Sequence, residues 1–496
     1  MASRNPQRPN ILFIVSDDQG AWALGCAGNP EIRTPNLDRL ASRGIRFGEF
    51  FCTSPVCSPA RASLLTGDIP STHGVHDWIR AGSMGPERID YLQGQTLVTD
   101  VLSQQGWRCG LSGKWHLGAS DRPRPGFVKW FAHQFGMGPY YDAPMVDGVT
   151  PVTVPGYVTD VLTDHACNFI RDESAQAEPF CLMLTYTAPH YPWIDCHPKA
   201  FADLYADCPF TSCPDEPPHP WFIGGNAAVA KGRAQRRDNL IGYFAAVSAM
   251  DAAIGRALDT LDALGLTEST LVVFVGDNGM NMGHHGIWGK GNGTMPQNVY
   301  DTSVKVPCII AQPGRIPAGR VDVTLLSGYD MFPTVLDWCG VAAPDNRERP
   351  GRSFRGILEG SPGRASGPVV VFDEYGPVRM VRTREWKYVH RYPDGPHELF
   401  DVVADPGERH NRVDDPACAP RVTSMHAELE RWFKRFVDPT RDGASRGVTG
   451  CGQVDLAERA SPTHRSFETS HTVGADWDLW VDSGVASGST SIPSNR

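Results

Sequence analysis

The sequence predicts an α/β protein in which a large, mostly parallel sheet is sandwiched by helices, with a smaller C-terminal antiparallel-sheet subdomain. Three observations predict this class. Strand-like and helix-like segments alternate through the first two-thirds of the chain, as in parallel sheets with crossover helices. The strand-like segments are near-continuous apolar runs, which is typical of strands buried on both faces. Beyond residue 345, short strand candidates recur at hairpin spacing.

The first strand is expected over residues 10–16, a β-branched and apolar run that ends in Asp17-Asp18. Gly44 is the expected stop of a helix over residues 35–43, and Pro59 lies in the first turn of a helix over residues 58–66. The other strands are expected over residues 45–53, 107–112, 180–187, 270–275 and 308–311. The other helices are expected over residues 96–105, 239–264 and 329–339.

Composition divides the chain into three parts. Residues 1–345 are expected to form the catalytic α/β domain, because the alternating pattern ends there. Residues 346–437 are expected to form a small α+β subdomain, with strands over 369–373, 380–382 and 386–391 and a helix over 421–436. Residues 438–496 are rich in Gly, Ser and Thr and are expected to be a loop-rich extension. The proline-rich residues 195–225 are expected to be an irregular insertion near the mouth of a site.

Charge and composition exclude some classes of partner. Lys and Arg number 46 against 56 Asp and Glu, a formal net charge of −10, which argues against binding to nucleic acid or to an anionic membrane. No apolar run is long enough for a membrane-spanning helix. The apolar residues 11–15 are too few for a signal-peptide core, so we expect a cytoplasmic protein. The 13 cysteines are scattered and odd in number, which indicates reduced thiols. The sequence does not predict an oligomeric state.

Polar residues follow two of the expected buried strands. Asp17 and Asp18 end the first strand, and Asp277 and Asn278 end the strand over residues 270–275. In parallel sheets, ligands bind beyond the carboxyl ends of the strands. Oxygen ligands of this kind suit Ca²⁺, with Mg²⁺ or Mn²⁺ as alternatives. Each pair alone also fits an ordinary loop start or turn.

A second cluster lies at the start of an expected helix. Cys57 comes just before that helix, where free N–H groups and the helix dipole favour negative charge. Arg61, four residues on, lies on the same helical face and reaches the Cys57 side chain or a bound anion. This pattern indicates an anion-binding site with a nucleophile. The alternative is a buried cysteine followed by a surface arginine.

The run Pro55-Val-Cys-Ser-Pro-Ala-Arg-Ala-Ser-Leu-Leu-Thr-Gly67 resembles the signature of the type I sulfatases, formylglycine-dependent members of the alkaline-phosphatase superfamily. Further motifs resemble the family in the expected order over most of residues 8–415. They are the strand before Asp17-Asp18, Gly113-Lys-Trp-His116, Thr187-Ala-Pro-His190, Val275-Gly-Asp-Asn-Gly279 with the later Lys290, and Pro396-His-Glu-Leu-Phe-Asp401.

The resemblance implies a mechanism and a role for each matching residue. Cys57 would be converted to 3-oxoalanine (formylglycine) by a separate formylglycine-generating maturation enzyme, and a hydroxyl of its hydrate would attack sulfur. The implied metal ligands are Asp17, Asp18, residue 57, Asp277 and Asn278. Arg61 would hold the diol, and Lys114 and Lys290 would clamp the transferred group. His190 would protonate the leaving oxygen or bind the sulfuryl group, and His116 would take the diol proton.

Several functional alternatives stay open. The leading hypothesis is a sulfuric ester hydrolase acting on an aryl, carbohydrate or choline sulfate. A phosphonate monoester or phosphodiester hydrolase with the same site is the alternative, and a non-catalytic metal-binding protein is a third. Residues 130–141 are aromatic-rich and fit a substrate wall as well as core packing. Trp193 is a candidate for the site mouth, His73 and His76 are candidate substrate contacts, and one of His284 and His285 is a candidate for lining the site.

Overall fold

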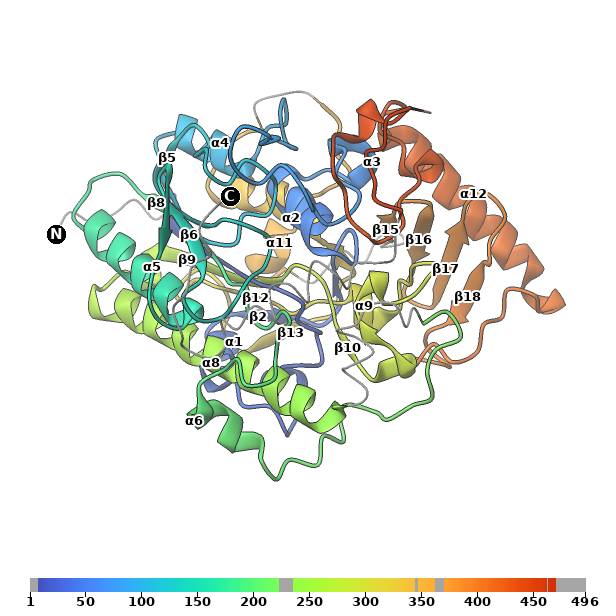
Figure 1. Cartoon of the computed structure of the whole chain (residues 1–496), viewed down its shortest axis with the longest axis horizontal. Coiled ribbons are helices and arrows are strands. Elements are labelled where there is room, and N and C mark those ends of the chain that lie inside the picture. The colour runs from blue at the N-terminus through green and yellow to red at the C-terminus, as the bar shows by residue number, and fades with distance from the viewer. Residues whose placement is uncertain (1–7, 223–234, 344–346, 362–369, 462, 470–496) are drawn as a thin grey trace, which may run out of the picture.

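A computed structural model describes residues 8–222, 235–343, 347–361, 370–461 and 463–469. Its centre is a ten-stranded sheet in the order β13-β2-β12-β9-β1-β8-β4-β5-β6-β7 (Figure 1). The middle strands β9, β1, β8, β4 and β5 run parallel, and β12, β6 and β7 pair antiparallel with their neighbours. The predicted α/β class, with a mostly parallel sheet, is confirmed.

The strands of this sheet are β1 Asn10–Ser16, β2 Ile45–Phe47, β4 Arg108–Gly113, β5 Phe127–His133, β6 Pro144–Asp147, β7 Thr150–Thr153, β8 Phe180–Thr185, β9 Thr270–Gly276, β12 Cys308–Ala311 and β13 Arg320–Asp322. Two small sheets pair β3 Phe50–Phe51 with β14 Leu326–Ser327, and β10 Asn281–Met282 with β11 Trp288–Gly289. In the centre, Ser16 of β1 pairs with Gly276 of β9, and Val15 pairs with Thr185 of β8. These three strands therefore end at the same edge.

Helices cover both faces of the sheet (Figure 1). Alternate residues of β1 point to opposite sides: Ile11, Phe13 and Val15 join the core under α2, α4 and α10, and Leu12 and Ile14 join the core under α1, α5 and α8. The longer helices are α1 Pro35–Ser42, α2 Cys57–Thr66, α4 Val98–Gln104, α5 Val158–Ser174, α8 Arg236–Ala263 and α10 Met331–Trp338. The short helices are α3 Pro70–His73, α6 Lys199–Ala202, α9 Asp301–Val304 and α11 Arg355–Leu358.

The C-terminal subdomain is a four-stranded antiparallel sheet with one long helix, on the right of Figure 1. Its elements are β15 Val371–Tyr375, β16 Val378–Arg382, β17 Trp386–Arg391, β18 Glu398–Asp401 and α12 Ala419–Phe436. Met425, Leu429 and Phe433 of α12 pack on the sheet at helical spacing. After α12 the chain returns to the catalytic domain, where Val448 packs against Val56 and Tyr375.

Several elements differ from the sequence prediction. The single strand expected over residues 45–53 is two short strands, β2 and β3, because the chain bends at Gly48 and passes to another sheet. The helix expected to begin at residue 58 begins at Cys57. Sequence analysis assigned no structure to α5, to β18 or to the β5–β6–β7 strands. Residues 223–225 of the expected insertion lie outside the described residues.

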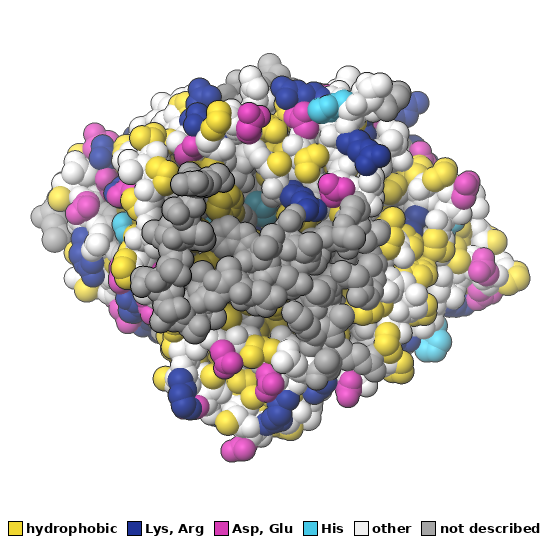
Figure 2. Space-filling view, in the orientation of Figure 1, with side chains coloured by type: hydrophobic (Ala, Val, Ile, Leu, Met, Phe, Trp, Pro, Cys, Tyr) yellow, Lys and Arg dark blue, Asp and Glu magenta, His cyan; other side chains and the backbone are white. Residues whose placement is uncertain are grey.

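Three further observations bear on the exclusions drawn from sequence. All 13 cysteines are free thiols. By length and composition α8 would be able to cross a membrane, but 83% of its apolar window is buried inside the protein, as expected of a core helix. On the face shown in Figure 2, basic and acidic side chains are interspersed over the surface.

Candidate active site

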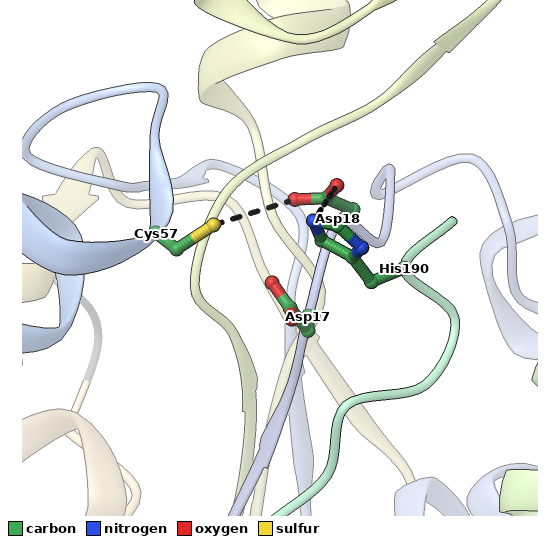
Figure 3. Close-up of side chains that lie close together, drawn as sticks. All are labelled: Asp17, Asp18, Cys57 and His190. Carbon is green, nitrogen blue, oxygen red and sulfur yellow. Dashed lines mark hydrogen bonds and ion pairs between the residues drawn. The ribbon is translucent and has the colours of Figure 1, made fainter. Parts of the chain in front are cut away.

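Four segments bring the predicted site residues to one edge of the large sheet. Asp17 and Asp18 follow β1, Lys114 follows β4, and Asp277 follows β9. His190 lies in the loop after β8. Ligand atoms of Asp17, Asp18, Cys57 and His190 all lie within 4.8 Å of one another. Figure 3 shows Cys57 approaching Asp18 from α2 on one side, and His190 from the loop on the other.

Cys57 is the first residue of α2 and is 2% exposed. Its Sγ lies 2.7 Å from Lys290 Nζ and 3.9 Å from Asp18 Oδ1. Burial opposes ionisation of the thiol, but the ammonium groups of Lys114 and Lys290 outweigh it and lower the pKa of Cys57 to about 6. The site therefore favours an anion at this position.

Buried cations pair with the carboxylates around Cys57. Lys114 Nζ lies 2.5 Å from Asp17 Oδ2, and Lys290 Nζ contacts Asp18 Oδ1. Arg61 Nε donates to Asp277 Oδ2 at 2.8 Å, and Arg61 Nη1 donates to the Lys114 carbonyl at 3.0 Å. We call this set the catalytic charge cluster; it comprises Asp17, Asp18, Cys57, Arg61, Lys114, Asp277, Asn278 and Lys290.

The oxygen atoms of the cluster fit a hard divalent cation. Asp17 Oδ1 and Asn278 Oδ1 are buried and accept no hydrogen bond from the described residues. The amide of Asn278 donates to Asp18 Oδ1 at 2.9 Å, so it turns its oxygen away from that carboxylate. Burial raises the pKa of Asp277 to about 6, and a bound cation would favour its ionised form. Carboxylate and amide oxygens are the ligands that Ca²⁺ and Mg²⁺ prefer.

The two predicted catalytic histidines have different environments. His190 Nε2 lies 3.5 Å from Asp18 Oδ2, and its Nδ1 faces the Tyr191 carbonyl at 2.6 Å. Burial opposes protonation of His190, but Asp18 and Asp17 outweigh it and raise its pKa. His116 instead has a pKa well below its ordinary value, first through burial and then through Lys114. His190 therefore holds a proton more readily than an ordinary histidine, and His116 is neutral.

The residues that sequence analysis named only as candidate substrate contacts or site-lining groups lie outside the catalytic charge cluster. His73 and His76 are buried, and their ring nitrogens face the Ser63 hydroxyl and the Arg441 carbonyl, outside the catalytic charge cluster, so their role as substrate contacts stays a prediction. Trp193 is also buried, packs in a core cluster and donates to the Pro189 carbonyl, so it does not form the site mouth. His284 Nε2 meets the Ser212 carbonyl, and the His285 ring stacks on Tyr300.

The aromatic-rich residues 130–141 mainly form core packing. Trp130 and Phe131 of β5 are 2% and 1% exposed and point into the cores on opposite faces of the sheet. Tyr140 is buried too, and its hydroxyl donates to the His190 carbonyl at 2.7 Å. Tyr141 is the exception, because it is 43% exposed. Of the two interpretations that the sequence left open, the structure therefore favours packing.

Sequence analysis missed residues that act on the site through the backbone or by being small. The Ile79 carbonyl meets His116 Nε2 at 3.0 Å, and Tyr243 Oη donates to the Asp18 carbonyl at 3.1 Å. A Cβ at Gly136 would lie 2.1 Å from the His116 ring, so only glycine fits there. A backbone carbonyl has no side-chain signature, and a glycine in a loop is common, so the sequence carried no signal for Ile79 or Gly136.

The site lies at one edge of a parallel sheet, where carboxylates, two lysines and an arginine surround the first residue of a helix. Such a site suits the hydrolysis of an ester of a tetrahedral anion, as in the alkaline-phosphatase superfamily. The sulfatase family model matches residues 9–341. A second model, the C-terminal region of N-sulphoglucosamine sulphohydrolase, matches residues 283–435. The chain therefore belongs to the sulfatase family and is a sulfuric ester hydrolase.

Relatives and solved structures agree with this assignment. The chain is 29% identical to an ulvan-active sulfatase of Formosa agariphila, over 87% of this chain and 82% of that protein. It is 30% identical to arylsulfatase A of Homo sapiens, over 85% and 87%. A solved structure in complex with its substrate D-glucosamine-2-N,6-O-disulfate has a TM-score of 0.74 at 25% identity, covering 86% of this chain and 98% of that one. The phosphonate monoester hydrolase of Agrobacterium radiobacter shares the fold, with a TM-score of 0.65 at 21% identity.

Proposed function

We propose that this sulfatase hydrolyses a sulfate ester of a carbohydrate, with formylglycine at position 57 and a bound divalent cation, Ca²⁺ in the first place. The observation that carries the substrate class is the structural match, over 98% of its chain, to a protein bound to a sulfated glucosamine. The names of two relatives, the ulvan-active sulfatase and an N-acetylglucosamine-6-O-sulfatase of Bacteroides thetaiotaomicron, support the same class.

Asp17, Asp18, Asp277 and Asn278 would hold the cation, and residue 57 would face it. When present, the cation polarises an oxygen of the ester, and the hydrated formylglycine provides a hydroxyl nucleophile that a thiol would not replace at a hard-metal site. The two buried oxygens that accept no hydrogen bond, Asp17 Oδ1 and Asn278 Oδ1, support this assignment. Lys290 Nζ lies 2.7 Å from Cys57 Sγ, and a positive charge at this distance supports an anionic nucleophile at position 57.

Lysine and arginine side chains would bind and stabilise the negative charge of the transferred sulfuryl group. Lys114 and Lys290 are both buried: Lys114 Nζ pairs with Asp17, and Lys290 Nζ contacts Asp18 and Cys57. Ammonium groups fixed in this way bind the oxygens of a sulfuryl group without reorganising during the reaction. Arg61 is held by Asp277 and the Lys114 carbonyl, so it stays oriented beside residue 57.

The two histidines would move protons at identified atoms. The Nδ1 of His190 faces a carbonyl and so carries a proton, which leaves Nε2 to deliver one to the leaving oxygen. The Nε2 of His116 also faces a carbonyl, so Nδ1 is the atom that accepts a proton. The raised pKa of His190 supports its role as the proton donor, and the lowered pKa of His116 keeps that ring neutral, the form that has a free nitrogen to accept a proton.

A substrate panel tests the proposed class. Protein made together with a formylglycine-generating enzyme would be assayed on N-acetylglucosamine-6-sulfate, D-glucosamine-2-N,6-O-disulfate, choline sulfate, an aryl sulfate and an aryl phosphonate monoester. We expect the highest kcat/KM on a sulfated sugar. A higher kcat/KM on choline sulfate would overturn the carbohydrate class, and a higher value on the phosphonate would move the protein to the phosphonate hydrolases.

Two measurements test the groups at the site. Mass spectrometry of the peptide containing residue 57 is expected to show the aldehyde in active protein, and an unmodified Cys57 in fully active protein would refute that part. Chelation is expected to remove activity and lower the melting temperature, and Ca²⁺ is expected to restore both better than Mg²⁺ or Mn²⁺. Full activity after verified loss of metal would refute the cation.

A further inference from the structure

A buried segment near the C-terminus contacts the catalytic domain beside the active site. We call residues 448–456 the C-terminal strap. Both family-model matches end before it, at residues 341 and 435. Val448, Cys451, Gly452 and Gln453 are all buried, and Gln453 is 0% exposed. The strap is therefore a built part of the structure, although sequence analysis placed it in a loop-rich extension.

Gln453 is the main attachment of the strap. Its backbone pairs with Ile79 as an isolated parallel bridge, in which Gln453 N donates to the Trp78 carbonyl at 2.8 Å and Arg80 N donates to the Gln453 carbonyl at 2.9 Å. Its side-chain oxygen accepts from His76 N at 2.9 Å, and its side-chain nitrogen donates to the Gly74 carbonyl at 3.0 Å. Backbone and side chain together fix residues 74–80.

The neighbouring strap residues strengthen this attachment. Gly452 N donates to Asp77 Oδ2 at 3.1 Å. A Cβ at Gly452 would lie 2.9 Å from the Arg80 Cβ, and its φ of +113° suits glycine, so the close approach requires this residue. The Gly450 carbonyl accepts from Trp78 Nε1 at 3.0 Å and from Asn292 Nδ2 at 3.1 Å. Asn292 is two residues from Lys290, so the strap joins the loops on two sides of the site.

The segment that the strap fixes contacts the reaction centre through Ile79. Ile79 N donates to the hydroxyl of Ser58, the residue after Cys57, at 3.0 Å. The Ile79 carbonyl meets His116 Nε2 at 3.0 Å. A carbonyl only accepts hydrogen bonds, so neutral His116 must carry its proton on Nε2. Its Nδ1 is buried and has no hydrogen-bond partner among the described residues.

We propose that the C-terminal strap is a positioning element for His116: through Gln453 it holds the Ile79 carbonyl that keeps the proton of His116 on Nε2 and leaves Nδ1 to accept a proton. The proposal rests on the proposed role of His116 in the reaction. Gln453 is a positioning residue, because it acts on His116 only through Ile79. A strap that merely closes the fold would leave the tautomer of His116 unchanged when Gln453 is replaced.

The test replaces Gln453 in the full chain and reads His116 directly. Gln453→Leu keeps much of the side-chain volume and removes the carboxamide bonds. With ¹⁵N-labelled histidine, the His116 signal, identified by its loss in His116→Gln, is expected to change from the Nε2–H form to a mixture of tautomers. We expect kcat to fall about tenfold, a part of the usual contribution of a catalytic base, with KM within about twofold. Arg465→Ala is the matched control, because that exposed guanidinium donates to the Thr469 hydroxyl and should leave both readings unchanged.

Gln453→Leu protein with the Nε2–H tautomer and an unchanged kcat would overturn the proposal. If this variant does not fold, Gln453→Glu is read in the same way, because it keeps an acceptor for His76 N and loses only the donated bonds. The tautomer is measured without substrate, so it reports on the strap even if the enzyme does not act on sugar sulfates. Conversely, suppose that Gln453→Leu shifts the tautomer as expected while the unsubstituted protein hydrolyses no sulfate ester. That result would refute the proposed function and leave the positioning role of the strap intact.

Discussion

The chain buries two clusters of opposite charges in different places. The catalytic charge cluster lies at the carboxyl edge of the large sheet. The second, which we call the subdomain ion cluster, comprises Lys387, Asp301 and Glu408 and joins the C-terminal subdomain to the catalytic domain. There Lys387 is 0% exposed, and its Nζ lies 2.9 Å from Asp301 and 2.6 Å from Glu408. Burial opposes ionisation of Asp301, but Lys387 and Lys305 outweigh it and lower its pKa to about 2.

The clusters differ in how their polar atoms are arranged around the charges. In the subdomain ion cluster one ammonium group bridges two carboxylates from different parts of the chain, and Lys305 and Arg382 add positive charge near Asp301. The one atom of this cluster without a hydrogen bond among the described residues, Glu408 Oε1, lies 2.6 Å from Lys387 Nζ. In the catalytic charge cluster, Asp17 Oδ1, Asn278 Oδ1 and Arg61 Nη2 have no hydrogen-bond partner among the described residues, and neither has Nδ1 of the neighbouring His116. Each such atom costs about 1–3 kcal/mol when buried, a cost that a bound ligand offsets. A buried charge cluster thus indicates a ligand-binding site where some of its polar atoms have no partner within the protein.

The largest expected effect is on the catalytic cluster. Cys57→Ala is expected to lower kcat/KM by about 10⁴-fold or more, because it removes the residue that becomes the nucleophile. Its melting temperature should change little, since the small side chain contacts charged groups rather than a packed apolar core. Cys418→Ala, which removes another buried cysteine far along the chain, is the control and should stay active. Normal turnover by folded Cys57→Ala protein would refute the assignment.

The subdomain ion cluster should show the opposite pattern. Lys387→Met leaves two carboxylates buried without their shared cation, so we expect a loss of about 3–5 kcal/mol in the free energy of unfolding, measured by urea denaturation. At a temperature where the variant is folded, kcat should stay within about twofold. Lys129→Met removes an exposed lysine, 46% accessible, and should change stability by less than about 0.5 kcal/mol. Loss of activity in folded Lys387→Met protein would erase the distinction between the clusters.

Lys290→Met tests the same distinction from the other side. We expect kcat/KM to fall about 10²- to 10³-fold, as when one fixed charge that stabilises the transition state is removed. The loss in unfolding free energy should be smaller than in Lys387→Met, because Asp18 keeps the Asn278 amide at 2.9 Å and His190 at 3.5 Å. Kinetics and denaturation would be measured on the same preparation. A stability loss as large as that of Lys387→Met with full activity would show that Lys290 is structural.

Much of the fold was predictable because its strongest signals are local. The apolar runs give β1 and β12 with the expected bounds, and the residues after β1 and β9 meet because parallel strands end at one edge. The strands β5, β6 and β7 were missed because they are short or partly exposed and give no continuous apolar run: β5 begins with partly or fully exposed residues, and β7 is mostly exposed. The helix α5 has apolar residues at helical spacing, Leu162, Ala166 and Phe169, a signal that was available and not used.

The residues of the site likewise fall into those that sequence analysis found and those that it missed. Side chains that do chemistry, such as Cys57 and Lys114, are of residue types that indicate their role. The Ile79 carbonyl and the glycine at 136 act through backbone position and through the lack of a side chain. Gln453 was hidden because its partners in residues 74–80 are about 375 positions away, beyond any local pattern. Sequence analysis therefore named the side chains that the structure brings together at the site and missed the groups that orient them.

The smallest expected effect concerns a third buried polar region, the stacked imidazoles of the C-terminal subdomain. The His390 ring lies between His397 at 4.2 Å and His426 at 4.4 Å. Its other charged or titratable neighbours include Tyr388, Tyr392, Glu430 and Arg379. Burial, followed by the two neighbouring histidines, lowers the pKa of His390 to about 4.

This shift makes the subdomain sensitive to acid. The unfolded chain binds a proton at His390 near pH 6.5 and the folded chain only near pH 4, so this stabilising contribution is present above pH 6.5 and is lost as the pH falls toward 4. His390→Phe, which keeps a stacking ring, should reduce the loss of unfolding free energy between pH 7 and pH 5 by about 1 kcal/mol, after allowance for solvent screening. Denaturation at the two pH values measures it, and His410→Phe, at an exposed histidine, is the control. Equal pH dependence in both variants would show that the stack, unlike the catalytic charge cluster, carries no linkage to protons.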